Sequence, residues 1–589
     1  MRVEQAPRKP GLTALLKNGT ALVSRPLHKF IDDEEGTVTA FAFVVFIMML
    51  VMGGIALDTM RHEASRAALQ STLDRAVLAG ATARSDAEAR ATVEDYFAKA
   101  GLSDYLLAEQ EGDIDTTLNS ATVTARAQRS LDTYLMKFAG VHTLGVSSAS
   151  SAAVNIPNLE GILVLDVSGS MDNNSKITNL KTAAKEFVTT MVGSAEPDTV
   201  TMSIVPFSFS VSPPESIYNA LAVDNRHEYS TCLEFADNDY HHATLTSGSS
   251  SLSSGIPANQ MIYTSHYGGF DDLNQPWRSC YNNDYMRILP YSTSETVLHA
   301  KIDSLQPDGN TSGNEGMNWG AALLDPTFRQ VTSAMIDAGE LSSTLAHVPA
   351  DYDDPETLKT IIFMGDGENT TSYFFDRDPP KYRGKFSNLY EVEYQDRVFK
   401  YAYKKKNIDV KRYGTDGESK CNTNGWECFY EATGPKQSVF YIHSSGYNDY
   451  YSVADDDFLT PQEFSNLNET IDGYIQTIQL DWEIAWGLMS PYYYGQITGD
   501  WDAWNDYRNR DQVTGSQKNV LMQKVCDATK TENVVVYTIG FEVPKGGTAE
   551  RELKKCATSP SHYFPANGID IKGAFSAIAA NVKQLRLTQ

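Results

Sequence analysis

A long uncharged segment dominates the hydrophobic pattern of the first sixty positions. The run GTVTAFAFVVFIMMLVMGGIAL occupies 22 residues, 36–57, and shows no polar stripe. As a helix it would extend ~33 Å, enough to cross a hydrocarbon layer of about 30 Å. A helix buried in a protein core would usually keep a polar face, and a cleaved signal peptide would be shorter and followed by a small-residue cleavage site. We therefore predict a single transmembrane helix over residues 36–57.

Helical periodicity continues beyond this run and then gives way to alternating strands. Apolar residues recur at helical spacing from Leu57 to Val77, and no proline interrupts the chain between 36 and 80. Residues 86–100 predict a second helix that ends at Gly101, and the segments 121–127 and 147–154 predict strands. Together these elements predict a small α+β stalk over residues 58–155.

The pattern changes again after residue 156, where apolar runs alternate with helical spacing. The runs 161–165, 200–206, 360–364 and 533–541 are typical of strands covered on both faces. A helix is expected over 177–191, and a final one that Asp570 would cap. This alternation predicts an α/β fold with a doubly wound, mostly parallel sheet.

Polar residues stand at three junctions of this predicted sheet. Asp166, Ser168 and Ser170 follow the first strand, Thr311 precedes a helix predicted over 315–324, and Asp366 follows the strand at 360–364. Singly, such residues are usually helix caps or turn formers. Together they would meet at the carboxyl edge of the sheet, where hydroxyl and carboxylate oxygens suit Mg²⁺, or Ca²⁺ or Mn²⁺, rather than zinc. We therefore predict a divalent-cation site.

The charge is distributed unevenly along the 589 residues. The net charge is −26, yet residues 1–31 carry six Lys or Arg and one acid, which leaves 43 basic and 74 acidic residues in the remainder. Such an acidic chain is not a general nucleic-acid binder, because phosphate binding needs clustered basic residues. Basic residues balance across the two ends of the apolar run, but the longer basic tail favours a cytoplasmic 1–35 and a periplasmic or extracellular body.

Six cysteines follow the apolar segment. None has the spacing of a zinc site, and an even number outside the cytoplasm predicts disulfides, although six cysteines allow 15 pairings. Neighbours in sequence suggest the pairs 232–280, 421–428 and 526–556, and six separate buried thiols are the alternative. The residues concerned are Cys232, Cys280, Cys421, Cys428, Cys526 and Cys556.

The N-terminal part resembles a known family. The start EEGTVTAFAFVVF, the run LDRAVLAGA at 73–81 and the alternating strands after them resemble the TadE/TadG-like membrane proteins of bacterial Tad (Flp) pilus assembly. The resemblance implies a single-pass inner-membrane protein with a pilin-like helix and stalk. Members that prepilin peptidase processes carry Glu five residues beyond the cleavage glycine, whereas Phe41 stands there when counted from Gly36. Because this glutamate is absent, we expect that the helix is not processed and serves as a permanent anchor.

The three polar loops resemble the von Willebrand factor A (vWA) domain with its metal-ion-dependent adhesion site (MIDAS). The resemblance implies that Ser168, Ser170 and Thr311 contact the cation directly, while Asp166 and Asp366 act largely through water. A cation held mainly by neutral oxygens retains charge for a carboxylate supplied by a partner. Residues 156–589 are about twice as long as such a domain, so two insertions are expected, at about 212–305 and 370–520.

These resemblances imply a membrane-anchored, non-enzymatic envelope protein of Tad/Flp pilus assembly or surface adhesion. Its partner would be a protein, either a pilus-assembly component or a surface ligand, that offers an acidic side chain to the metal. An envelope scaffold that recruits other machinery through the vWA domain is the alternative. A metal-dependent hydrolase is a third, but the sequence has no HExxH, GxSxG or Walker motif. The second insertion holds 17 of the 31 tyrosines, which indicates either an interface or a core of its own.

Overall fold

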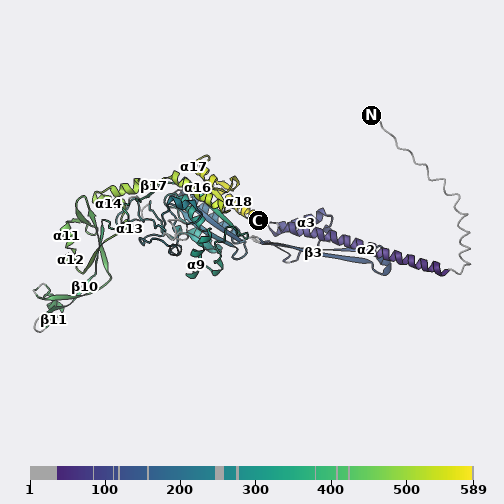
Figure 1. Ribbon diagram of the computed structural model, residues 1–589, viewed down its shortest axis with the longest axis horizontal. Coiled ribbons are helices and arrows are strands. Elements are labelled where there is room, and N and C mark those ends of the chain that lie inside the picture. The colour runs from purple at the N-terminus through teal and green to yellow at the C-terminus, as the bar shows by residue number, and fades with distance from the viewer. Residues whose placement is uncertain are drawn as a thin grey trace, which may run out of the picture. The chain divides into compact units, whose positions relative to one another are not determined.

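The computed structural model describes most of the chain between Gly36 and Arg586 (Figure 1). The described residues form two compact units, one ending at Asn155 and the other containing the residues that follow. The basic tail predicted over residues 1–35 lies outside the described part. The described ranges are 36–81, 83, 85–110, 112–116, 120–155, 158–245, 258–273, 277–377, 380–405, 409–421, 423 and 425–586.

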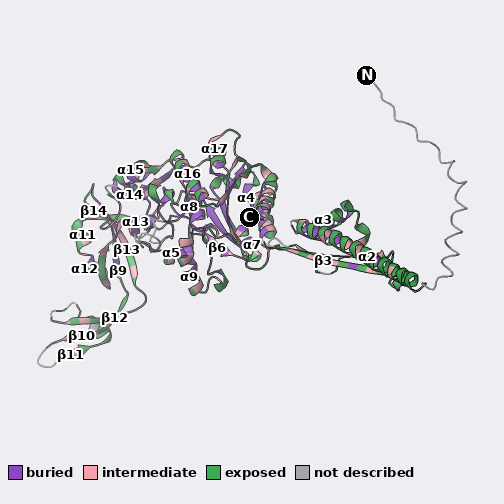
Figure 2. Ribbon diagram, turned by 45° about the vertical axis from the view of Figure 1, so that its right-hand side comes forward, coloured by how far each residue is buried: buried purple, intermediate pink, exposed green. Residues whose placement is uncertain are grey.

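The first unit is built on one long helix. Helix α2, Gly36–Gly80, continues for 45 residues, as the absence of proline predicted. Its uncharged first half is largely exposed (Figure 2), and by length and composition the helix can cross a membrane. An apolar surface of this size exposed on all sides is the pattern of a lipid-facing helix.

The second half of α2 packs on a helix and a sheet. Ser85 caps helix α3, Asp86–Lys99, by accepting a hydrogen bond from the Glu88 amide. The antiparallel sheet has the order β1-β2-β3, and its buried core includes Leu73, Phe97 and Val123. This arrangement confirms the α+β composition predicted for this part of the chain. The strands and short 3₁₀ turns are β1 (Ile114–Thr116), β2 (Ser120–Asp132), β3 (Thr143–Asn155), η1 (Ser103–Tyr105) and η2 (Met136–Ala139).

The second unit contains a six-stranded sheet in the order β19-β18-β7-β4-β5-β6. Every pair is parallel except β5 with β6, which is antiparallel. The order reverses beside β4, which confirms the predicted doubly wound, mostly parallel sheet. The strands are β4 (Asn158–Asp166), β5 (Val200–Phe207), β6 (Leu289–Ser292), β7 (Thr357–Gly365), β18 (Val535–Phe541) and β19 (Tyr563–Ala566).

Helices cover both faces of this sheet, which explains why its central strands are apolar throughout. One face packs against α4 (Lys176–Met191), α7 (Glu295–Ser304) and α18 (Ile571–Arg586). The other face packs against α8, α9, α16 and α17, whose bounds are Gly313–Ala322, Arg329–Asp337, Gly515–Thr531 and Thr548–Cys556. Short 3₁₀ turns are η3 (Gly169–Ser175), η6 (Pro326–Phe328), η7 (Ser343–Leu345), η8 (Pro560–His562) and η9 (Gly568–Asp570).

The first additional segment follows β5 and has little regular structure. It contains α5 (Glu215–Ala220), η4 (Asp237–His241) and η5 (Asp284–Met286). Part of the range expected to be inserted, Leu289–Ser304, instead supplies β6 and α7 to the central sheet and its cover. The edge strand β6 has only four residues, too few for a clear strand pattern.

The second additional segment, between β7 and α16, supplies nearly all of a separate aromatic core. Aromatic side chains such as Phe375, Trp486 and Tyr507 are buried together there, with Phe375 stacked on Trp486 at 4.7 Å between ring centroids. The five-stranded sheet β15-β14-β13-β9-β16 forms its centre. Its strands are β9 (Leu389–Tyr394), β13 (Gln437–Ser444), β14 (Asp449–Ser452), β15 (Asp457–Leu459) and β16 (Tyr474–Gln479).

The same segment carries two smaller sheets and several short helices. One sheet has the order β11-β10-β12 and the other pairs β17 with β8. The strands are β8 (Ser372–Phe374), β10 (Arg397–Lys404), β11 (Val410–Arg412), β12 (Glu427–Ala432) and β17 (Asp511–Val513). The helices are α10 (Gly414–Glu418), α11 (Pro461–Ser465), α12 (Leu467–Thr470), α13 (Trp482–Leu488), α14 (Pro491–Thr498) and α15 (Asp502–Asn509).

Candidate metal centre

Two adjacent parallel strands bring the first and third polar loops together. Strands β4 and β7 pair in register up to Leu165 and Met364. Asp166 ends β4, and Asp366 follows the last residue of β7, so the two carboxylates leave the sheet at the same level. This is the carboxyl edge beside the reversal of strand order, where doubly wound sheets bind ligands.

Hydrogen bonds connect four of the five predicted residues. The Ser168 amide donates to Asp166 Oδ1 over 2.8 Å, and the Ser170 hydroxyl donates to Asp366 Oδ1 over 2.7 Å. The Ser168 and Ser170 hydroxyl oxygens lie 3.0 Å apart. The Asp366 amide approaches Asp166 Oδ2 at 3.5 Å. The structure therefore gathers Asp166, Ser168, Ser170 and Asp366 into one polar cluster.

The second loop reaches this cluster through its backbone. The Gly169 amide donates to the Gly309 carbonyl, and the Asp308 amide donates to the Val167 carbonyl, both over 2.9 Å. Gly309 has φ +78°, and a Cβ there would lie 2.7 Å from the Tyr281 ring, so this turn requires glycine. Thr311 and Asp166 line the same small cavity. The loop thus places Thr311 beside the cluster.

A buried lysine supports the loop that carries Thr311. The Lys518 ammonium on α16 donates to the Thr311 carbonyl over 3.3 Å and to the Ser312 hydroxyl over 2.5 Å. Burial lowers the pKa of Lys518, which the nearby Glu315 carboxylate opposes, and burial raises the pKa of Glu315. Because α16 directly follows the second additional segment, Lys518 connects that segment to the Thr311 loop.

Sequence reasoning missed a lysine at the centre of this cluster. Lys176 Nζ donates to Asp366 Oδ2 over 3.0 Å and lies 4.0 Å from Glu542 Oε2. Asn174 and Ser175, which precede it, both have positive φ, 54° and 58°, and Asn174 Nδ2 donates to Glu542 over 3.2 Å. Lys176 is the first residue of α4, where acids are usually favoured, so no sequence rule marks it.

The geometry and the oxygen donors fit a hard divalent cation. Adjacent ligands of octahedral Mg²⁺, at about 2.1 Å from the metal, are about 3 Å apart, the separation of the Ser168 and Ser170 hydroxyl oxygens. Burial and the neighbouring Asp366 carboxylate raise the pKa of Asp166. Among the described residues, no three His, Cys, Asp or Glu side chains gather as a metal site. A cation here would therefore depend on the serine and threonine oxygens.

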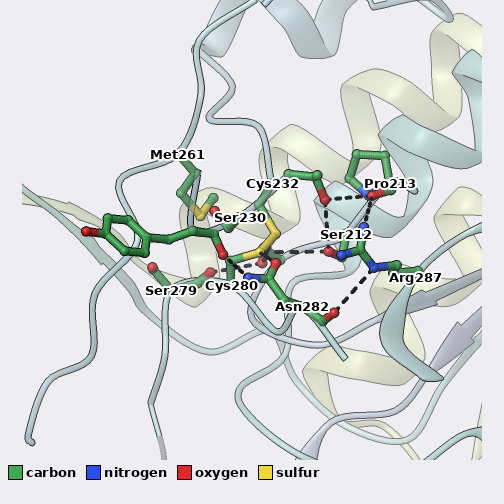
Figure 3. The surroundings of a disulfide bond; sticks show 12 residues. Ser212, Pro213, Ser230, Cys232, Met261, Ser279, Cys280, Asn282 and Arg287 are labelled. Atoms are coloured by element: carbon green, nitrogen blue, oxygen red, sulfur yellow. Dashed lines mark hydrogen bonds between the residues drawn. A yellow bond between two sulfur atoms is a disulfide. The ribbon is translucent and has the colours of Figure 1, made fainter. Parts of the chain in front are cut away.

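The three disulfides all join cysteines that neighbour each other in sequence. Their pairs are Cys232–Cys280, Cys421–Cys428 and Cys526–Cys556, and no described cysteine is free. Figure 3 shows the first of them beside the segment that leaves β5, where Arg287 donates to the Pro213 carbonyl over 3.4 Å. The Ser312 hydroxyl donates to the Phe209 carbonyl in the same segment over 2.5 Å. This disulfide therefore fastens the first additional segment next to the Thr311 loop.

A comparison with protein families gives one match, in the N-terminal part of the chain. Residues 36–83 match the family described as putative Flp pilus-assembly TadE/G-like. A comparison with curated proteins found no match.

Several solved structures are similar to the chain at low identity. The vWF domain of the type V pili tip protein Mfa5 from Porphyromonas gingivalis is 13% identical with a TM-score of 0.30, over 73% of this chain and 97% of that one. The pilus adhesin SpaC from Lactobacillus rhamnosus GG is 10% identical with a TM-score of 0.27, over 82% and 35%. The pilus adhesin RrgA from Streptococcus pneumoniae is 11% identical with a TM-score of 0.27, over 81% and 48%. The chain thus spans between a third and a half of the two adhesins.

The family match concerns the first unit, and the strand order concerns the second. The chain resembles TadE/G-like pilus-assembly proteins over residues 36–83, and its second unit has a doubly wound α/β fold.

Proposed function

We propose that this chain is a membrane-anchored, non-enzymatic envelope protein of Tad (Flp) pilus assembly or surface adhesion. It binds a protein partner through a divalent cation, Mg²⁺ or alternatively Ca²⁺ or Mn²⁺, held by Asp166, Ser168, Ser170, Thr311 and Asp366. The observation that carries the proposal is the contact between the two serine hydroxyls and Asp366 at the carboxyl edge of a doubly wound sheet.

The charge of the cluster supports binding of a partner's carboxylate. Lys176 compensates Asp366, and three of the five proposed ligands are neutral. A divalent cation in this setting would keep positive charge for an outside ligand. In this arrangement Ser168, Ser170 and Thr311 contact the metal, while the two aspartates orient bound water and the serine hydroxyls.

The partners of the two serines favour binding over catalysis by a serine nucleophile. Within the described residues, neither Ser168 nor Ser170 is hydrogen-bonded to a histidine that would act as a base. An envelope scaffold that recruits machinery through the same site is the second candidate, and it differs only in the partner.

The proposed placement has the N-terminus in the cytoplasm, α2 across the inner membrane and the second unit in the periplasm or outside the cell. The three disulfides support this placement, because such bonds persist in oxidising compartments. The asymmetry between the basic residues 1–31 and the acidic remainder supports the orientation.

Partner capture with and without metal tests the proposed function. The full chain in detergent is used as bait against envelope extract in Mg²⁺ or in EDTA, alongside Thr311→Ala and the surface control Ser194→Ala. We expect partners that are retained in Mg²⁺, released by EDTA, lost with Thr311→Ala and kept with Ser194→Ala. Capture that is indifferent to both EDTA and Thr311→Ala would contradict metal-dependent binding.

A further inference from the structure

The hairpin between β2 and β3 ends in an unusually apolar turn. Residues 134–141 read YLMKFAGV and include one charge, Lys137. The side chains of Tyr134 and Phe138 are 58% and 77% exposed, and Leu135 and Val141 are exposed too. Turns in water are usually built from polar residues and glycine. An exposed apolar cluster of this kind indicates a contact that lies outside the protein.

This turn packs against α2 at the end of the uncharged segment. A Cβ added to Gly54 would lie 2.4 Å from Leu135 Cβ, so Leu135 rests directly on the helix backbone. The Asp58 carboxylate, buried within the unit, accepts hydrogen bonds from the amides of Tyr134, Leu135 and Met136 at 2.8–3.1 Å. These contacts fix the turn along α2 at the level of residues 54–58.

The change from apolar to charged residues occurs at the same level in helix α2 and in the hairpin. Asp58 is the first charge after the apolar run of α2, and Asp132 is the last charge of β2 before the turn. Arg61 joins these two levels, since its guanidinium donates to the Asp132 carbonyl over 3.3 Å and lies 3.8 Å from the centroid of the Tyr134 ring. Gly54 precedes Asp58 by about 6 Å along the helix axis, so Leu135 lies on the apolar side of this level.

From this geometry we infer that residues 134–141 form a second membrane contact, inserted into the surface of the bilayer that α2 spans. The inference rests on the proposed membrane anchor and extends it to a segment about eighty residues further along the chain. The apolar turn is continuous with the apolar part of α2, so the turn contacts lipid. The hydrocarbon layer that surrounds Gly54 must also surround Leu135, which packs on it.

The composition of the turn supports lipid over a protein partner. Tyrosine rings favour the level of the lipid headgroups, and lysine and arginine near them reach back toward water. Tyr134 with Arg61 and Phe138 with Lys137 repeat this combination, with Lys137 Nζ 5.6 Å from the Phe138 ring centroid. Two contacts with the bilayer, one by α2 and one by the turn, would restrict the tilt and rotation of the first unit.

Accessibility of spin labels in the full chain tests this inference. A nitroxide is attached to Phe138→Cys in liposomes, and its accessibility to oxygen, which enters bilayers, is compared with that to a water-soluble nickel chelate. Met49→Cys, in the middle of the apolar run, is the lipid reference, and Leu107→Cys is the matched control. Leu107 is also exposed, at 46%, but its amide bonds to Arg126, about 20 Å along β2 from Asp132. All described native cysteines are in disulfides, so the new thiol is labelled selectively.

We expect the label at 138 to behave like the label at 49, accessible to oxygen and protected from nickel, while 107 shows the reverse. If 138 behaves like 107 while 49 remains in lipid, the turn faces water and the inference is wrong, although the anchor stands. If 138 is protected from both reagents, a protein surface covers the turn and the inference is equally wrong. If 49 is also accessible to nickel, the proposed anchor itself fails.

Discussion

Lys176 sets the charge of the candidate metal centre. Its ammonium lies 3.0 Å from Asp366 Oδ2 in a nearly buried environment, so the cluster contains two carboxylates and one fixed cation. Such a cation holds Asp366 in place without metal, but it also repels a divalent ion that enters beside it. At the scale of single residues, Lys176 would therefore stabilise the metal-free cluster and lower its affinity for a divalent cation.

Replacing Lys176 by methionine separates these two effects. We expect Lys176→Met to lower the free energy of unfolding in EDTA by about 3 kcal/mol, because it leaves the Asp366 carboxylate buried without its cation. Mg²⁺ affinity should rise about tenfold, which adds ~1.4 kcal/mol to the stabilisation by saturating Mg²⁺. Denaturant unfolding with and without Mg²⁺ measures both the loss of stability in EDTA and the additional stabilisation by Mg²⁺. Lys185→Met, also on α4, is the control. Unchanged or weaker Mg²⁺ affinity would refute the repulsion.

His266 is expected to make stability depend on pH. Burial, with the nearby Arg508 charge, lowers the pKa of this imidazole to about 4, below the value of about 6.5 in the unfolded chain. The unfolded state therefore binds the additional proton first as the pH falls. Stability from this group is fully present above pH ~6.5 and is lost progressively down to pH ~4, by about 3 kcal/mol in total.

The test compares the wild type with His266→Phe, which keeps an aromatic ring among Tyr373, Trp277 and Tyr507. Denaturant unfolding at pH 7 and pH 5 should show a smaller loss of stability on acidification in the variant. The control variant His299→Gln, on α7, should lose as much stability between pH 7 and pH 5 as the wild type. Equal pH dependence in all three proteins would show that His266 does not titrate as described.

At the scale of elements, close packing of α8 against the sheet positions the Thr311 loop. Gly316 and Gly320 face β4 and β5, and a Cβ on Gly316 would lie 2.7 Å from the Phe207 ring and 2.9 Å from Val164 Cγ1. Both neighbours are buried in the core, so neither can move aside freely. The two glycines therefore allow the helix to approach the strands that carry Asp166 and Phe207.

We expect Gly316→Ala to destabilise the second unit by about 1–3 kcal/mol by overpacking. It should also weaken Mg²⁺ binding, because α8 would be displaced together with the loop at its N-terminus. Gly573→Ala is the matched control: it also lies within a helix, α18, but its Cβ would meet no atom within 4 Å. That variant should be neutral or stabilised by up to about 1 kcal/mol. Equal thermal stability of the two variants would contradict this packing argument.

The elements differ in how far sequence predicts them, for physical reasons. The strands β4, β7 and β18 are covered by helices on both faces, so their sequences are apolar runs that can be recognised directly. In β9 and β16, by contrast, partly exposed residues such as those of LYEVEY and YIQTIQ mix polar and aromatic side chains without clear periodicity. The aromatic core beneath them depends on contacts between distant segments.

In the candidate site, too, some residues can be predicted from the sequence and others cannot. Asp166, Ser168 and Ser170 share one loop, so their proximity follows from local spacing, and the alternation of strands and helices brings Thr311 and Asp366 to the same edge. The contact of Lys176 with Asp366 joins residues 190 positions apart, and that of Lys518 with Thr311 joins residues 207 apart. Neither lysine belongs to a motif, so only the folded arrangement reveals them.

At the scale of the whole molecule, the disulfides and the charge distribution support the same placement in the envelope. All six described cysteines are paired, and the acidic residues lie almost entirely after residue 31. We expect the full chain, denatured without reductant, to take up no maleimide and to take up six after reduction, as measured by mass. Six reactive thiols before reduction would contradict an extracytoplasmic second unit.

Titration of Mg²⁺ into the full chain, solubilised in detergent and stripped with EDTA, tests the central claim most directly. Calorimetry should show one Mg²⁺ bound per chain, with affinity reduced at least tenfold in Asp166→Ala and Thr311→Ala and unchanged in Ser194→Ala. Circular dichroism checks that each variant remains folded. If folded Asp166→Ala and Thr311→Ala bind Mg²⁺ as tightly as the wild type, the metal does not bind at this edge of the sheet.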